Sequence, residues 1–128
     1  MSRALEQLRI LLVEDSPAIA AAVGDLLEEL GYHVVGPTGC MATALEMAEK
    51  EHLSAAIVDL NIRGSKAYSV LRILERREIP YVVASGYADW SMPSEFSGRP
   101  RLTKPFSERM LEEKLVSLLG RSRHISEK

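Results

Sequence analysis

Short apolar runs alternate with stretches of helical periodicity along the whole chain, and this alternation constrains the fold more than any other feature. The runs expected to form strands cover residues 8–13, 32–35, 55–58, 81–84 and, more weakly, 101–103. Most of them are apolar at consecutive positions, as in strands that are buried on both faces. Strands separated by helices imply right-handed crossovers, so we expect an α/β fold with a five-stranded parallel sheet and helices on both faces.

Apolar residues recur at helical spacing between these runs. Helices are expected over about residues 17–30, 41–50, 67–74 and 108–119. Ser16 and Ser107 stand where N-caps are needed, and Gly31 and Gly120 stand where helices should stop. The signals at both ends of two helices therefore agree with the periodicity.

The stretch 86–100 breaks the alternation. It contains Pro93, Gly98 and Pro100 and shows no sustained helical period, so we expect a loop with at most one helical turn. The fourth helix of the fold would then be short or absent. Trp90, together with Met92 and Phe96, forms either a patch for a partner or a cover for the core that a missing helix leaves open.

Size and composition indicate one domain over residues 1–128, with a core at about 8–119 and flexible tails at 1–7 and 121–128. Sixteen basic against 18 acidic residues give a net charge of −2, without the basic excess that nucleic-acid binding requires. No apolar run approaches the roughly 20 residues of a membrane span. A single cysteine excludes an intramolecular disulfide and fits a reducing compartment, so we expect a cytoplasmic protein.

Polar side chains stand at the carboxyl ends of four expected strands. Glu14 and Asp15 follow the first strand, and Asp59 follows the third. Ser85 ends the fourth, and Lys104 follows the fifth. Each could singly be a loop residue or a cap, but a parallel sheet brings all of these ends to one edge, where ligands bind.

Several carboxylates at one edge repel each other unless a cation joins them. Hard oxygen ligands favour Mg²⁺, so we expect Glu14, Asp15 and Asp59 to form a magnesium site. A neighbouring ammonium and a hydroxyl would support phosphoryl transfer, and an Asp carboxylate can itself be the nucleophile.

Four segments together resemble the signatures of response-regulator receiver domains. They are Leu-Leu-Val-Glu-Asp-Ser-Pro (11–17), Val-Asp-Leu-Asn (58–61), Ala-Ser-Gly-Tyr (84–87) and Thr-Lys-Pro-Phe (103–106). The resemblance covers about residues 8–119. It implies a flavodoxin-like sheet with strand order 2-1-3-4-5 and a stand-alone receiver similar to those of chemotaxis.

The resemblance also implies a role for each site residue. Asp59 would be the phosphoacceptor and a metal ligand, with Asp15 a direct Mg²⁺ ligand and Glu14 acting through water. Asn61 would add its backbone carbonyl to the metal. Ser85 and Lys104 would contact the phosphoryl group, and the Lys104–Pro105 bond would be cis.

Three departures from the family pattern are visible. Arg101 stands where the family usually has an aromatic switch residue. The common Met-Pro after the acceptor Asp is replaced by Asn61-Ile62-Arg63, although Gly64 remains. The run 80–88 resembles a receiver subgroup, common in alphaproteobacteria, in which a Phe-Ala-Thr-Gly-Tyr-like sequence ends the fourth strand.

As a receiver, the chain would take its phosphoryl group from a histidine kinase or a histidine phosphotransfer protein and signal through contacts with a downstream protein, as a monomer or weak dimer. It would be no enzyme beyond its own phosphorylation and dephosphorylation. It ends soon after the last expected helix, so we expect no output domain. Alternatives are an adaptor that works without phosphorylation and, less favoured, an Asp-nucleophile phosphatase. The latter needs an acid/base Asp two residues after the nucleophile, where Asn61 stands.

Overall fold

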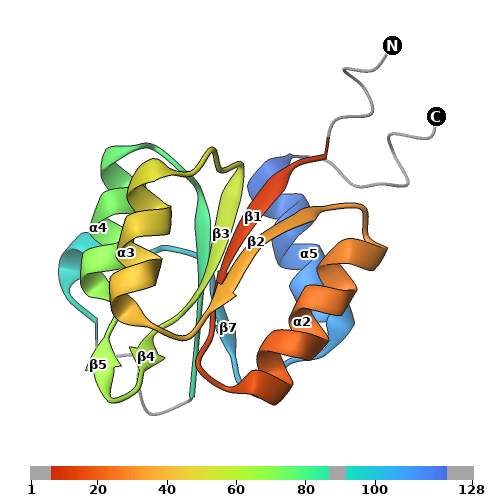
Figure 1. Cartoon of the computed structure of the whole chain (residues 1–128), viewed down its shortest axis with the longest axis horizontal. Helices are drawn as coiled ribbons and strands as arrows, with labels where there is room; N and C mark the ends of the chain where they lie inside the picture. The colour runs from red at the N-terminus through yellow and green to blue at the C-terminus, as the bar shows by residue number, and fades with distance from the viewer. Residues whose placement is uncertain (1–6, 87–91, 121–128) are drawn as a thin grey trace.

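The structure, a computed structural model, describes residues 7–86 and 92–120. Five parallel strands form a central sheet in this part of the chain (Figure 1). They are β1 (Arg9–Val13), β2 (His33–Thr38), β3 (Ala55–Asp59), β6 (Tyr81–Ser85) and β7 (Arg101–Thr103). Their spatial order is β2-β1-β3-β6-β7. This parallel sheet and its strand order confirm the predicted fold.

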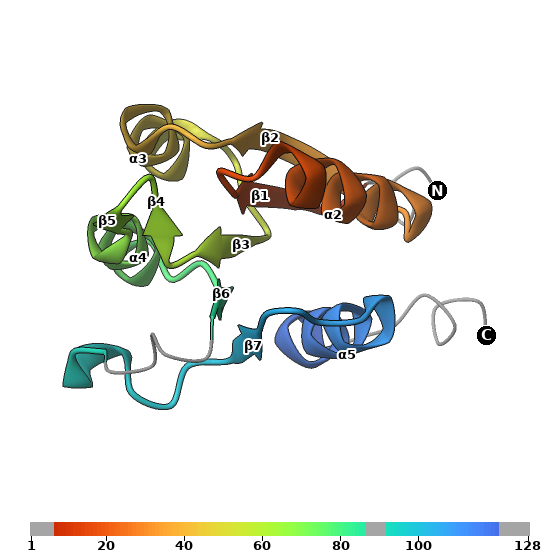
Figure 2. The ribbon, with the colours of Figure 1, turned by 90° about the horizontal axis from the view of Figure 1, so that it is seen from below.

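Helices cover both faces of the sheet (Figure 2). On one face lie α2 (Pro17–Glu29) and α5 (Glu108–Leu119), and on the other lie α3 (Met41–Lys50) and α4 (Tyr68–Arg76). None of the helices in the described ranges is long and apolar enough to cross a membrane.

The side chains of each central strand alternate between the two faces of the sheet. In β1, Ile10 and Leu12 pack into the cluster under α2 and α5, whereas Leu11 and Val13 pack into the cluster under α3 and α4. All four side chains are at most 1% exposed. Burying one such side chain stabilises the fold by roughly 1.5–3 kcal/mol, which explains why the four residues after Arg9 are all apolar rather than every second one.

The helix ends follow the predicted capping chemistry. The Ser16 hydroxyl accepts a hydrogen bond of 3.3 Å from the backbone N–H of Ile19. The Ser107 hydroxyl accepts one of 3.1 Å from the N–H of Met110. Gly120 ends α5 in the left-handed conformation, with φ 74°. The Ser caps and the terminal glycine are therefore confirmed.

Strand β2 is longer than the predicted 32–35, because it continues through Gly36 and Pro37 to Thr38. A Gly-Pro pair usually indicates a turn, which is why the prediction stopped early. Proline is accepted at the edge of a sheet, where its missing N–H costs no ladder bond, and β2 is an edge strand. Gly36 has φ 103°, and a Cβ there would lie 3.0 Å from the Leu12 carbonyl oxygen. Only glycine fits this close approach.

A small hairpin after β3 was not predicted. Strands β4 (Asn61–Ile62) and β5 (Ser65–Lys66) pair antiparallel. The two turn residues, Arg63 and Gly64, have φ values of 52° and 86°, as two-residue hairpin turns of this hand require. Ile62, 2% exposed, anchors the hairpin in the core under α3 and α4. An Arg-Gly pair is a weaker hairpin signal than Asn-Gly, so this hairpin is not evident from the residues alone.

In residues 92–100, the described part of the segment between β6 and β7, the structure contains a single turn of 3-10 helix, η2 (Ser94–Phe96). This agrees with the prediction of at most one helical turn. Phe96 is 3% exposed, and its ring stacks on Tyr68 of α4 at 5.6 Å. Met92 packs against the same core. Both therefore cover the core, while Trp90 lies outside the described residues.

Polar contacts also hold residues 92–99 on α4, and we call the whole set of contacts the α4 clasp. Arg72 Nη2 lies 2.7 Å from Glu95 Oε2, and the guanidinium carbon is 5.7 Å from the centre of the Phe96 ring. Arg99 Nη2 donates to Glu75 Oε1 at 3.0 Å. Side chains of α4 thus hold residues 92–99 in place, and Figure 1 shows η2 beside α4.

Candidate functional site

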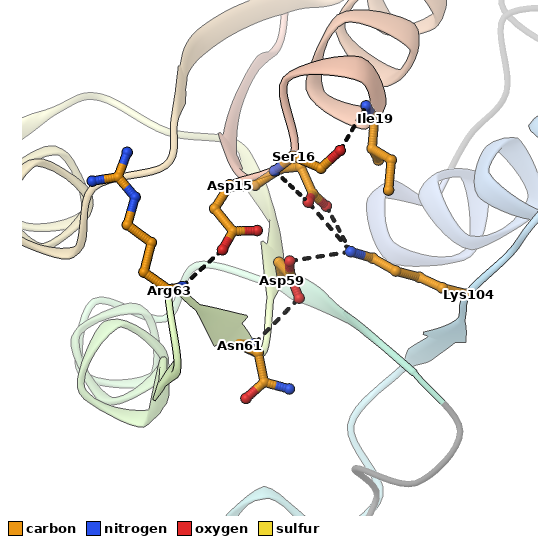
Figure 3. Close-up of polar contacts among 8 residues, drawn as sticks. Asp15, Ser16, Ile19, Asp59, Asn61, Arg63 and Lys104 are labelled. Atoms are coloured by element: carbon orange, nitrogen blue, oxygen red, sulfur yellow. Dashed lines mark hydrogen bonds and ion pairs between the residues drawn. The ribbon is translucent and has the colours of Figure 1, made fainter.

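The carboxyl ends of the strands bring three carboxylates together, as predicted (Figure 3). Glu14 and Asp15 follow β1, and Asp59 is the last residue of β3. An oxygen of each lies within 4.8 Å of an oxygen of both others. Glu14 and Asp59 are 6% and 5% exposed, and Asp15 is half-buried. Such a concentration of negative charge at a poorly hydrated edge needs compensation.

Lys104 supplies part of that compensation. Its Nζ lies 3.1 Å from Asp59 Oδ2 and 3.0 Å from Glu14 Oε1. The Lys104 backbone N–H donates to the Ser85 carbonyl at 2.8 Å, which fixes the start of the loop after β7. The bond from Lys104 to Pro105 is cis, as expected. Lys104 thus forms an ion pair with both Glu14 and Asp59.

The cluster shifts the protonation of its members. Burial, and next the charge of Glu14, raise the pKa of Asp59 from 3.8 to about 6, although Lys104 acts in the opposite direction. Burial lowers the pKa of Lys104, but hydrogen bonds to Glu14 and Asp59 outweigh it and leave this pKa above its ordinary value. Lys104 therefore stays charged at neutral pH, and Asp59 ionises only near neutrality in the absence of another cation.

Both oxygens of Asp59 have donors. Oδ2 accepts from Lys104, and Oδ1 accepts from the Asn61 backbone N–H at 3.2 Å. The second contact closes a local turn between an Asp and the residue two positions later, a common use of Asp after a strand. Asn61 is thereby held directly beside the Asp59 carboxylate, as Figure 3 shows.

The other two carboxylates are held by backbone donors. Glu14 Oε2 accepts from the Ser16 N–H at 3.1 Å. Asp15 Oδ2 accepts from the Arg63 N–H at 2.7 Å, across 48 positions in the sequence. This second contact could not be predicted from the sequence, because a main-chain N–H carries no residue-type signal. Only recognition of the β4–β5 hairpin could have suggested it.

Ser85 and Arg101 lie at the strand positions that the sequence predicts for them. Ser85 ends β6, is 1% exposed and pairs in register with Thr103 of β7. Arg101 begins β7 and is exposed, so its charged side chain keeps its contact with solvent. The Arg101 position therefore does not bury an aromatic ring, in agreement with the departure seen in the sequence.

The donor set fits a divalent cation. Three carboxylates face one ammonium, so the ionised cluster keeps an excess of negative charge. Oxygen ligands of this kind suit Mg²⁺, which also keeps several waters. A cavity of about 330 Å³ is lined by Glu14, Asp15 and Arg63, and its lining does not include Asp59.

The family model of the response regulator receiver domain matches residues 10–116. The chain therefore belongs to the receiver domain family of response regulators, which act in two-component systems.

Individual proteins show the same likeness. The solution structure of SdrG from Sphingomonas melonis Fr1 is 41% identical, with a TM-score of 0.78 over 88% of this chain and 97% of that one. The receiver domain of the sensor histidine kinase PA1611 from Pseudomonas aeruginosa PAO1 is 25% identical, with a TM-score of 0.77 over 90% of this chain and 99% of that one. In that crystal structure a magnesium ion is coordinated in the active site cleft.

A curated relative is the transcriptional regulatory protein PdtaR of Mycobacterium tuberculosis, 27% identical over 122 residues. The match covers 92% of this chain and 60% of PdtaR, so the chain spans about 60% of the length of that relative.

Proposed function

We propose that this receiver accepts a phosphoryl group on Asp59, from a histidine kinase or a histidine phosphotransfer protein, in a reaction that uses Mg²⁺. The observation that carries the proposal is the contact of Lys104 with Asp59, 3.1 Å, inside a cluster of three carboxylates. A positive charge beside the acceptor and an acidic metal site are the two aids that phosphoryl transfer needs.

In the transfer, a carboxylate oxygen of Asp59 forms a bond to phosphorus while the bond from phosphorus to the donor histidine nitrogen breaks. The electron pair of that bond returns to the imidazole, and an acyl phosphate remains on Asp59. Lys104 then pairs with a phosphoryl oxygen. The buried Ser85 hydroxyl at the end of β6 donates a hydrogen bond to another phosphoryl oxygen.

Glu14, Asp15 and Asp59 would hold the metal, together with the backbone carbonyl of Asn61. Bound there, Mg²⁺ neutralises charge that develops on the phosphoryl oxygens. The Asn61 N–H already binds Asp59 Oδ1, which places the peptide of Asn61 next to the acceptor. Asp15 would be a direct ligand in this arrangement, and Glu14 would act largely through water.

The signal would leave this domain through a surface that binds a downstream protein, and the domain itself would carry out only its own phosphorylation and dephosphorylation. On this proposal the protein works as a monomer or weak dimer.

Intact-mass measurement after treatment with a small phosphodonor tests the proposal. The wild type should gain one phosphoryl group in Mg²⁺ and almost none in EDTA, and Asp59→Asn should gain none. Glu49→Gln, which changes an exposed acid on α3, is the matched control and should behave as the wild type.

Full labelling of Asp59→Asn would refute the assignment of the acceptor. A wild type that gains no mass, from the small donor or from a phosphorylated phosphotransfer protein, would favour the adaptor that works without phosphorylation. Continuous release of inorganic phosphate from unrelated phosphate esters would favour the phosphatase.

A further inference from the structure

The turn of the β4–β5 hairpin contacts a metal-site carboxylate through its backbone. The Arg63 N–H lies 2.7 Å from Asp15 Oδ2. In Figure 3 this contact reaches Asp15 from the side opposite to Lys104, and the Arg63 side chain points away from Asp59. The donor is thus the peptide group, and the guanidinium is not directed at the acceptor.

Asp15 is also held from the loop that follows β2. A Cβ added at Gly39 would lie 2.9 Å from the Asp15 Cα, so glycine is needed for the two backbones to pack this closely. Close packing at the Cα and a hydrogen bond at the carboxylate together restrict both the backbone and the side chain of Asp15. The other carboxylate oxygen stays available to a metal.

The conformation of the turn makes this hydrogen bond possible. Arg63 and Gly64 both adopt left-handed backbone angles, with φ 52° and 86°. Ile62, 2% exposed, fixes the start of the hairpin in the core. Because a non-glycine residue seldom adopts this region, the Arg63 conformation is one that the surrounding structure imposes.

We infer that the hairpin turn is a positioning element for the metal site: its Arg63 N–H orients Asp15 before Mg²⁺ arrives and thereby strengthens Mg²⁺ binding. This inference rests on the magnesium site of the proposed function. Groups that orient a metal ligand through a hydrogen bond typically change metal affinity about 10- to 100-fold when they are lost. Loss of this hydrogen bond should weaken Mg²⁺ binding by roughly 10-fold, the lower end of that range, because Asp15 remains packed against Gly39.

Gly64→Val tests the inference through the backbone alone. A Cβ at Gly64 meets no atom within 4 Å, so the substitution acts by disfavouring the φ of 86° and opening the turn. Gly98→Val is the matched control, since Gly98 has φ 84°, has equally open space, and lies in the loop before β7. Arg63→Ala removes the guanidinium and keeps the N–H.

Mg²⁺ titration calorimetry should show binding weakened roughly 10-fold in Gly64→Val and unweakened in Gly98→Val and Arg63→Ala. In the metal-free wild type, the residue 63 amide should exchange slowly with solvent, and this protection should be lost in Gly64→Val while β1 and β3 stay protected.

Unchanged or tighter Mg²⁺ binding by Gly64→Val, with β1 and β3 intact, would overturn the inference, as would equal weakening in Arg63→Ala. Absence of Mg²⁺ binding by the wild type would instead refute the magnesium site of the proposed function, which separates the two failures.

Discussion

Replacing the buried Asp59 carboxylate by an amide should stabilise the metal-free protein at neutral pH, even though the carboxylate is the proposed acceptor. The side chain is 5% exposed and faces Glu14. Its pKa is raised from 3.8 to about 6, first by burial and then by Glu14. The rise corresponds to roughly 3 kcal/mol of unfavourable free energy for the charged form at pH 7. Asp59→Asn removes that charge with little change of shape, so we expect a gain of about 1–3 kcal/mol.

The sign of the pH dependence follows from the same values. Between about pH 4 and 6 the unfolded chain has released the Asp59 proton, whereas the folded protein still holds it. Raising the pH through this window takes a proton from the folded state and destabilises it. The favourable contribution is complete below the unfolded pKa of 3.8 and is lost as the pH passes about 6. Asp59→Asn should lack this component.

Urea unfolding followed by far-ultraviolet circular dichroism, in EDTA and between about pH 4 and 7.5, measures the effect. Asp25→Asn, at an exposed acid on α2, is the control for the loss of one negative charge. The difference between Asp59→Asn and the wild type should grow as the pH rises toward 7. Parallel curves for these two proteins, or a less stable Asp59→Asn at pH 7, would refute the electrostatic reasoning.

Three further predictions concern the site and the core. Lys104→Arg should keep the charge but not the compact geometry, so intact-mass labelling of Asp59 should persist. The change in amide exchange that accompanies labelling should become smaller than in the wild type, and an undiminished change would contradict this. Phe96→Ala should reduce the free energy of urea unfolding by about 3–5 kcal/mol, whereas Met110→Ala, at an exposed position, should change it by less than about 0.5 kcal/mol; equal effects would contradict the burial of Phe96. Mg²⁺ at about 100 times its Kd should stabilise the wild type by about 2.7 kcal/mol relative to EDTA, measured by urea unfolding. A similar gain in Asp15→Asn at the same Mg²⁺ concentration would contradict the role of Asp15 as a metal ligand.

The sequence indicated most of the fold because strands and helix ends depend on local signals, whereas the strand order followed from the resemblance to receiver domains. Consecutive apolar residues such as 55–58 predict a strand buried on both faces, and Ser16 with Gly31 limits the first helix. A parallel sheet then brings strand ends to one edge by its topology, so the proximity of Asp15, Asp59 and Lys104 needed no contact information.

The missed features depend on backbone geometry and on a choice between similar charges. The contact of the Arg63 N–H with Asp15 requires a left-handed turn that Arg-Gly only weakly indicates. The ion pair of Arg72 with Glu95 could not be predicted from the sequence either, because the chain contains many arginines and glutamates. Which of them pair depends on how the segments pack. Edge position, which allows Pro37 inside β2, is likewise a property of the assembled sheet.

The α4 clasp makes the attachment of residues 92–99 sensitive to ionic strength. The pairs Arg72–Glu95 and Arg99–Glu75 are all at least 33% exposed, so dissolved ions screen them, whereas the apolar contact of Phe96 is not weakened by salt. In concentrated salt the segment is held mainly by the apolar contacts of Phe96 and Met92, while the parallel sheet keeps its backbone hydrogen bonds. Local opening of this region is therefore adjustable by the solvent without a matching loss of global stability, so comparisons of its dynamics require a fixed salt concentration.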